Sequence, residues 1–95
     1  MGTIYFFFLG RGIPNSNLIV SVRELRRFLG TLRYIRGYTL FHGDSCWDGD
    51  EEETSLLLVT GVTEEQAIDI IQKYKQEYSQ EAVWFIQGNL NNTFM

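Results

Sequence analysis

A polar loop containing two glycines follows the first apolar segment of the chain and carries residue types that hold anions. Arg11 offers a planar cation with five hydrogen-bond donors, and Gly12 lets another molecule approach the backbone closely. Asn15 adds a polar side chain, and Arg23 lies where a helix is predicted to begin and its free amides attract anions. The loop has neither the Lys-Ser/Thr pair of a phosphate-binding loop nor a G-x-G-x-x-G pattern. It predicts a site for a small anion, with a plain connecting loop as the alternative.

Residues 42–53 contain the chain's one histidine and one cysteine among several acids. His42 and Cys46 are too few ligands for a zinc site, and no third group is evident that would orient a catalytic pair. The acids do not follow the D-x-D-x-D-G order of a calcium loop. We therefore expect an acidic solvated loop with no metal, no cofactor and no catalytic residue. Trp47 is the exception, because an aromatic side chain in a polar loop folds back as a lid or meets a ligand or partner.

Charge is distributed unevenly along the chain, although the formal net charge is only −4. Residues 1–36 hold six arginines against the single acid Glu24, whereas residues 37–95 hold two lysines against eleven acids. This asymmetry can guide an anionic ligand to the first helix or one subunit to another, and two ordinary solvated surfaces are the alternative. The acidic composition and the lack of an RNA-binding sequence pattern disfavour nucleic acid as a partner.

Two helices and four strands must position these residues. Ser21 and Thr63 each begin a capping-box pattern, with Glu24 and Gln66 three residues later, so helices are expected after both. Strands are expected at residues 3–9, 37–42, 54–60 and 82–87. The order β-α-β-β-α-β predicts an α+β, ferredoxin-like sandwich in which two helices lie on one face of a four-stranded antiparallel sheet.

The first and third predicted strands are apolar on both faces. In the first strand, Ile4, Phe6 and Phe8 alternate with the equally apolar Tyr5, Phe7 and Leu9. Such continuous apolar runs are typical of strands buried on both sides, yet two helices cover only one face of a sheet. A second copy of the chain is the simplest cover for the other face, so a homo-oligomer is expected. Tyr5 or Phe7 is expected to face that second copy.

The length of 95 residues indicates one domain spanning residues 1–95, in which the polar segment 88–95 is expected to be flexible. A single cysteine excludes an intrachain disulfide and favours a reducing compartment. No apolar run approaches the ~20 residues of a membrane helix, so no membrane association is expected. The run Ile4–Leu9 is also too short for the apolar region of an export signal, and a cytoplasmic location is expected.

About half of the chain resembles a small family of uncharacterised bacterial ferredoxin-like proteins. The shared residues are Gly37-Tyr-Thr39, Gly43, Trp47, Glu53-Thr-Ser55, Tyr74-Lys75 and Tyr78-Ser-Gln-Glu-Ala-Val83. The resemblance implies the fold and no activity.

Together these observations favour a non-enzymatic, oligomeric binding protein for a small anionic, nucleotide-like ligand. The expected ligand contacts are Arg11, Gly12, Asn15, Arg23, Tyr38, His42 and Trp47. Tyr38 or Trp47 would stack on the ligand, and a phage-encoded antagonist of host defence is one setting for such capture. The alternative is a protein-interaction module or inhibitor that uses the acidic hairpin, residues 43–53, and Trp47. A small enzyme with His42 as its proton-transfer group is a third hypothesis, weakened by the short list of candidate catalytic residues.

Overall fold

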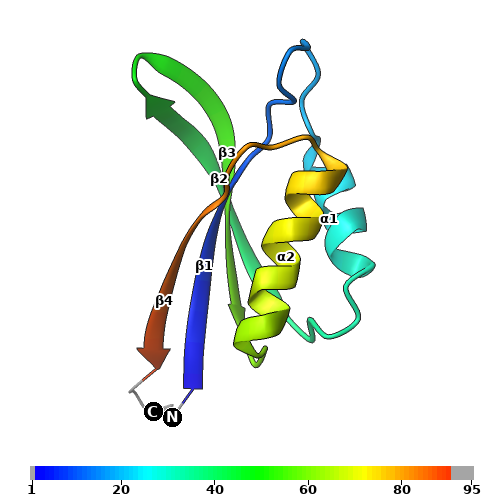
Figure 1. Cartoon of the computed structure of the whole chain (residues 1–95), viewed down its shortest axis with the longest axis vertical. Coiled ribbons are helices and arrows are strands. Elements are labelled where there is room, and N and C mark those ends of the chain that lie inside the picture. Colours follow the sequence, from blue (N-terminus) through cyan, green and yellow to red (C-terminus); the bar gives the residue numbers. More distant parts are fainter. Residues whose placement is uncertain (1, 91–95) are drawn as a thin grey trace.

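The computed structural model describes residues 2–90 and confirms the α+β, ferredoxin-like fold (Figure 1). In chain order the elements are β1 (Gly2–Gly10), α1 (Val22–Gly30), β2 (Tyr38–Trp47), β3 (Asp50–Thr60), α2 (Glu64–Glu77) and β4 (Trp84–Leu90). The four strands form one antiparallel sheet in the order β2-β3-β1-β4. This order places the doubly apolar strands β1 and β3 at the centre of the sheet, as predicted. Both helices lie on the same face of the sheet.

The hydrophobic core lies between the sheet and the two helices. Tyr5, Phe7 and Leu9 of β1 point into it and are almost completely buried. Their side chains therefore face the helices, and the prediction that Tyr5 or Phe7 faces a second copy is wrong. Because side chains alternate along a strand, the outward aromatics of β1 are Phe6 and Phe8. The helices complete the core with the buried residues Leu25, Phe28, Leu29, Ala67, Ile70 and Tyr74.

Both helices begin where the capping patterns predict. At α2 the Thr63 hydroxyl accepts from the Gln66 amide, and the Gln66 side chain accepts from the Thr63 amide, which completes the box. At α1 the Ser21 hydroxyl accepts from the Glu24 amide, but the Glu24 carboxylate bonds to Arg27 and Tyr78 instead. Only half of the predicted box forms at α1, because stronger donors compete for the carboxylate.

The β2–β3 hairpin is longer than predicted. Trp47 pairs directly with Asp50, so the connection consists of Asp48 and Gly49 alone. Their φ angles of 52° and 86° are those of a type I′ turn, whose twist matches that of the flanking strands. The segment expected to be an acidic loop is therefore strand almost to its end, and its acids stand on regular β-structure. Of the segment 88–95 that is expected to be flexible, residues 88–90 belong to β4 and residues 91–95 lie outside the described part.

Candidate functional site

Arg11 lies inside the fold and connects two segments of the chain. The residue is 8% exposed, and its Nη1 donates to the Val20 carbonyl at 2.9 Å. Its Nη2 is 3.5 Å from Oε2 of Glu53, and its buried Nε has no hydrogen-bond partner among the described residues. An anion that reached this guanidinium would therefore have to displace Glu53. Arg11 as a ligand contact stays a prediction.

The loop that carries Gly12 and Asn15 is itself a small hairpin. Gly12 forms an isolated antiparallel bridge with Ile19, and the Ile13 amide donates to the Leu18 carbonyl. Asn15 lies at the exposed turn with a φ of 61°. The base of the loop is anchored by the C-terminal part of α2 and the residues after it, since Tyr74 donates to the Gly10 carbonyl and Gln80 to the Gly12 carbonyl. Gly12 is thus held within the fold, and Asn15 projects from it.

Four exposed arginines lie on and just after α1. Arg23 and Arg26 are one turn apart on the exposed side of the helix, and Arg33 and Arg36 follow its end. We call these four residues the arginine stripe. All four are exposed, and none forms an ion pair with a described residue. Arg23 is the one sequence-predicted contact that belongs to this group.

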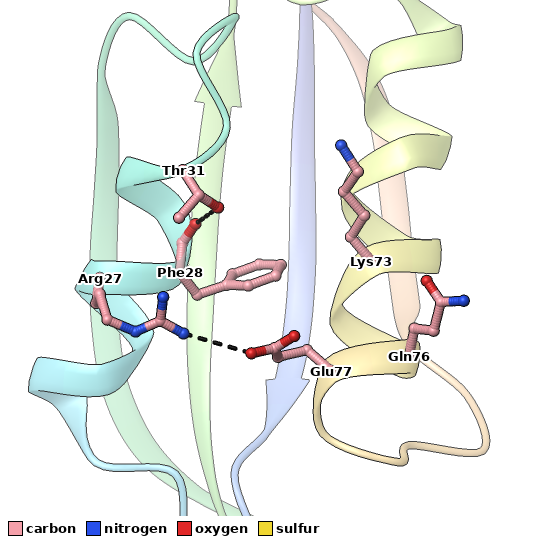
Figure 2. A pocket seen from close by; sticks show the side chains of 6 residues that line it. All are labelled: Arg27, Phe28, Thr31, Lys73, Gln76 and Glu77. Atoms are coloured by element: carbon pink, nitrogen blue, oxygen red, sulfur yellow. Dashed lines mark hydrogen bonds and ion pairs between the residues drawn. The ribbon is translucent and has the colours of Figure 1, made fainter.

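The two helices leave a groove of about 290 Å³ between them, which none of the predicted site residues lines. Figure 2 shows Arg27 of α1 and Glu77 of α2 pointing toward each other, with Phe28 between the helices. The Arg27–Glu77 pair is 3.4 Å long, and Lys73 is paired with Asp69 at 3.1 Å. Each cation that lines the groove is thus matched by an acid, which makes the groove a weaker anion site than the arginine stripe.

Two tyrosine–carboxylate hydrogen bonds join the helices to each other and to the loop after α1. Tyr78 donates to Glu24 at 2.7 Å, and Tyr34 donates to Asp69 at 2.6 Å. The bonds from Arg27 and then Tyr78 lower the pKa of Glu24 to about 2. The bonds from Tyr34 and then Lys73 likewise lower the pKa of Asp69, while burial and these carboxylates raise the pKa values of both tyrosines. These carboxylates act in the fold as structural anions.

The protein should therefore lose stability as the pH is lowered through a window set by the pKa of Glu24. Its folded-state pKa is about 2, against an ordinary value of 4.5, so the unfolded chain binds more protons in this range. The stabilisation is fully present above about pH 4.5 and is lost as the pH falls toward about 2. We expect Glu24→Gln to flatten this part of a curve of urea midpoint against pH. Glu65→Gln, an exposed acid with no side-chain hydrogen bond to a described residue, should leave the slope unchanged; an equal loss of slope in both variants contradicts the assignment.

His42 and Tyr38 lie on the helix-facing side of β2. The Nδ1 atom of His42 is 2.7 Å from Oγ of the buried Ser55, its cross-strand partner. The described residues include no group of three His, Cys, Asp or Glu side chains that could hold a metal ion. Tyr38 pairs with Val59, six residues along β3 from the Glu53 that contacts Arg11, which corresponds to about 20 Å. The seven predicted residues therefore do not all lie in one place. Arg11 and Gly12, which are adjacent in sequence, lie together at the base of the loop, and Tyr38 lies elsewhere on the sheet.

Within residues 2–90, the face of the sheet away from the helices is apolar and no element covers it. We call the residues that line it, Ile4, Phe6, Phe8, Phe41, Leu56, Leu58, Trp84 and Ile86, the open face. Cross-strand pairing sets Phe41, Leu56, Phe8 and Trp84 in one continuous row across all four strands. Phe41 is 56% exposed and Trp84 is 63% exposed. No charged side chain interrupts this row.

The outer part of the hairpin, residues 44–53, bends away from the helices toward the open-face side (Figure 1). We call this segment the hairpin arm. Glu52 lies over Gly10 and Gly12, and a Cβ atom at residue 10 would overlap its carboxylate. At the end of the arm the Trp47 ring lies against Trp84, with centroids 5.0 Å apart and the ring planes at 60°. Trp47 therefore folds back, one of the two outcomes expected for it, yet it stays 68% exposed.

Trp84, Phe41 and Ile86 were not among the residues singled out from the sequence. The sequence feature that could have identified these residues is their position in the predicted fold. The β-α-β-β-α-β order places the last strand beside the first. Once Phe8 is assigned to the uncovered face, its cross-strand neighbour Trp84 follows. A search for charged and polar residues passes over such a site, since it consists entirely of apolar side chains.

Comparisons with known proteins support the fold and nothing finer. No protein-family model matches the chain, and no curated protein does. Among solved structures, the chain is similar to the crystal structure of CutA1 from Pyrococcus horikoshii, with a TM-score of 0.52 and 15% sequence identity. The match covers 99% of this chain and 87% of that one. The ferredoxin-like architecture is thus shown, whereas the resemblance to an uncharacterised bacterial family stays a prediction. No helix in residues 2–90 is long and apolar enough to cross a membrane.

Proposed function

We propose that this chain is a non-enzymatic binding protein that works as a homo-oligomer assembled through its open face. The observation that carries the proposal is the continuous apolar row Phe41–Leu56–Phe8–Trp84, which no helix or strand of the described part of the chain covers. The exposed parts of Phe8, Phe41, Trp84 and Ile86 amount to roughly 400 Å², taking about 150–250 Å² for each side chain. The largest apolar patch of a monomeric protein commonly has about this size and is often functional. A second copy is a fitting cover because it brings an identical apolar surface.

The ligand in this proposal is a small anion of nucleotide-like size, and the arginine stripe is its binding surface. The stripe belongs to the helix layer, on the opposite side of the sheet from the open face, so assembly leaves it accessible. Its guanidinium groups can form bidentate hydrogen bonds with phosphate oxygens. Arg23 would be a direct contact, and Arg11 would act by holding the loop that leads into α1. Sequestration of such a ligand by a phage-encoded antagonist of host defence is one role that this chemistry supports.

A protein-interaction module or inhibitor is the second candidate function, and one observation favours it. Trp47 stands at the end of the acidic hairpin arm with most of its surface exposed, as the aromatic anchor of a protein contact would. In that case the partner would be a basic protein and the arginine stripe would bind nothing. Ligand titration separates the two candidates.

The test combines sedimentation velocity with calorimetric titration of nucleotides and cyclic nucleotides. The proposal predicts an assembly larger than a monomer and binding of at least one anion. Arg23→Ala should weaken that binding by about 10–150-fold, the loss of one charge-assisted contact of about 1.5–3 kcal/mol. Lys75→Ala removes a cation from α2 and should have little effect. A monomer at all concentrations refutes assembly, and failure of every anion to bind refutes the ligand while leaving assembly standing.

A further inference from the structure

The Trp47–Trp84 contact joins the hairpin arm to the open face. Trp47 lies at the end of β2, and Trp84 is the first residue of β4, the strand at the opposite edge of the sheet. The contact exists because the arm bends toward the open-face side, where the Glu52 carboxylate lies over Gly10. The arm therefore stands over one end of the open face as a raised edge. The surface offered to a second copy is therefore bounded at this end by two indole rings.

The exposed area of the open face indicates why the hairpin arm is needed for a stable contact between copies. The exposed side chains of the sheet supply roughly 400 Å², which falls short of the about 600 Å² per partner in the smallest stable interfaces. Trp47, 68% exposed, raises the total to roughly 600 Å². The arm thus closes the gap between an apolar patch and a surface large enough for a specific contact between copies.

The chemistry around the two rings has the usual arrangement of such a contact. Trp84 continues the apolar row through its cross-strand neighbour Phe8, so the indoles extend the apolar centre without a break. Asp48 and Asp50 flank Trp47 at the tip and provide a polar rim. Tryptophan is enriched among the residues that carry most of the energy of an interface, and charged groups are typical of an interface rim.

We propose that the hairpin arm closes over a second copy of the chain, and that Trp47 and Trp84 become buried together in the contact between copies. This inference rests on the proposed self-association and adds to it the contact that the outer part of the β2–β3 hairpin makes with the second copy. It assigns the arm to assembly, in place of a site for a basic protein partner.

Intrinsic fluorescence tests this directly, because Trp47 and Trp84 are the chain's two tryptophans. Wild-type protein is diluted through the concentration range in which sedimentation shows assembly and dissociation. We expect a blue-shifted emission maximum and reduced quenching by acrylamide, a neutral quencher, in the assembled form. Trp47→Ala should raise the dissociation constant by at least about 30-fold, as expected for an interface residue worth about 2 kcal/mol. Ile68→Ala, which truncates an exposed apolar side chain of α2 on the other side of the sheet, should leave it unchanged.

The outcomes separate this inference from the proposed function. A chain that assembles while its tryptophans stay red-shifted and freely quenched overturns the inference alone, and the copies then meet without the arm. An assembly that Trp47→Ala leaves at wild-type affinity does the same. A chain that stays monomeric at every concentration refutes self-association itself. Because Trp47 is mostly exposed within one copy, the variant should fold, which circular dichroism verifies.

Discussion

Replacing Phe41 by aspartate should convert the assembled protein into a folded monomer. Phe41 is more than half exposed in one copy and lies in the apolar row of the open face, opposite Leu56. In an assembly through this face, the new carboxylate would be buried without a partner, at a cost of about 3–5 kcal/mol. This corresponds to an increase of at least about 100-fold in the dissociation constant. Sedimentation velocity across a range of concentrations measures the change.

The matched control for Phe41→Asp is Ile68→Asp. Ile68 is an exposed apolar residue of similar size, and its position on α2 places it on the other side of the sheet from the open face. We expect Ile68→Asp to assemble like wild type and both variants to keep the wild-type circular dichroism spectrum. Assembly of Phe41→Asp with wild-type affinity contradicts an interface at the open face, wherever else the copies meet.

The second large effect is expected in the core, from Phe7→Ala. Phe7 is completely buried between the rings of Tyr5 and Phe85, with both centroid distances at 6.2 Å. Truncating a fully buried phenylalanine costs about 3–5 kcal/mol, through lost transfer free energy and the cavity left behind. This is a large share of the about 5–15 kcal/mol by which most domains are stable.

Phe85→Ala is the comparison that isolates burial. Phe85 is the cross-strand partner of Phe7 on the same face of the sheet, but it is 44% exposed at the edge. Because much of its ring is already in contact with water, truncation should cost less than about half as much. Each variant is unfolded with urea in the Phe41→Asp background. Because that background is expected to be monomeric, the measured free energy of unfolding contains no contribution from assembly. Equal losses at the two positions contradict the placement of Phe7 in the core.

Much of the fold could be predicted because local signals and the apolar pattern agree. The helix starts at Ser21 and Thr63 follow from side chains that must satisfy free backbone amides within three residues. The central place of β1 and β3 follows from their apolar character on both faces. These features depend on neighbours in sequence or on the composition of one strand, which a sequence shows directly.

Features that depend on pairing between distant segments were harder to predict. Both sets of alternate residues in β1 are apolar, so nothing within the strand decides whether Phe7 or Phe8 meets the helices. Asp48-Gly49 is a strong hairpin-turn signal, but the surrounding acids suggested a loop, and the length of the hairpin was underestimated. Glu24 left its capping role because Tyr78, 54 residues away in sequence, competes for its carboxylate.

The candidate site was predicted least well, for a physical reason. The residues singled out were those with reactive or charged side chains, and the structure distributes them between the core, the helix layer and the hairpin. Arg11 illustrates this, since a loop arginine between glycines suggests an exposed cation, yet Val20 and Glu53 hold it inside. The open face arises from residues on four strands, none of which marks a site when considered alone.

The place of β4 in the sheet has a consequence for the order of events during synthesis. β4 pairs with β1 across about 80 positions of sequence, as in the pair of Tyr5 with Gln87. When the N-terminal part of the chain leaves the ribosome, one edge of β1 has no strand to bond until the last residues of the domain are made. The β2–β3 hairpin can close early around its two-residue turn, whereas β4 must dock last. The backbone N–H and C=O groups along that edge of β1 thus remain unpaired, and accessible to chaperones, for nearly the whole time of translation.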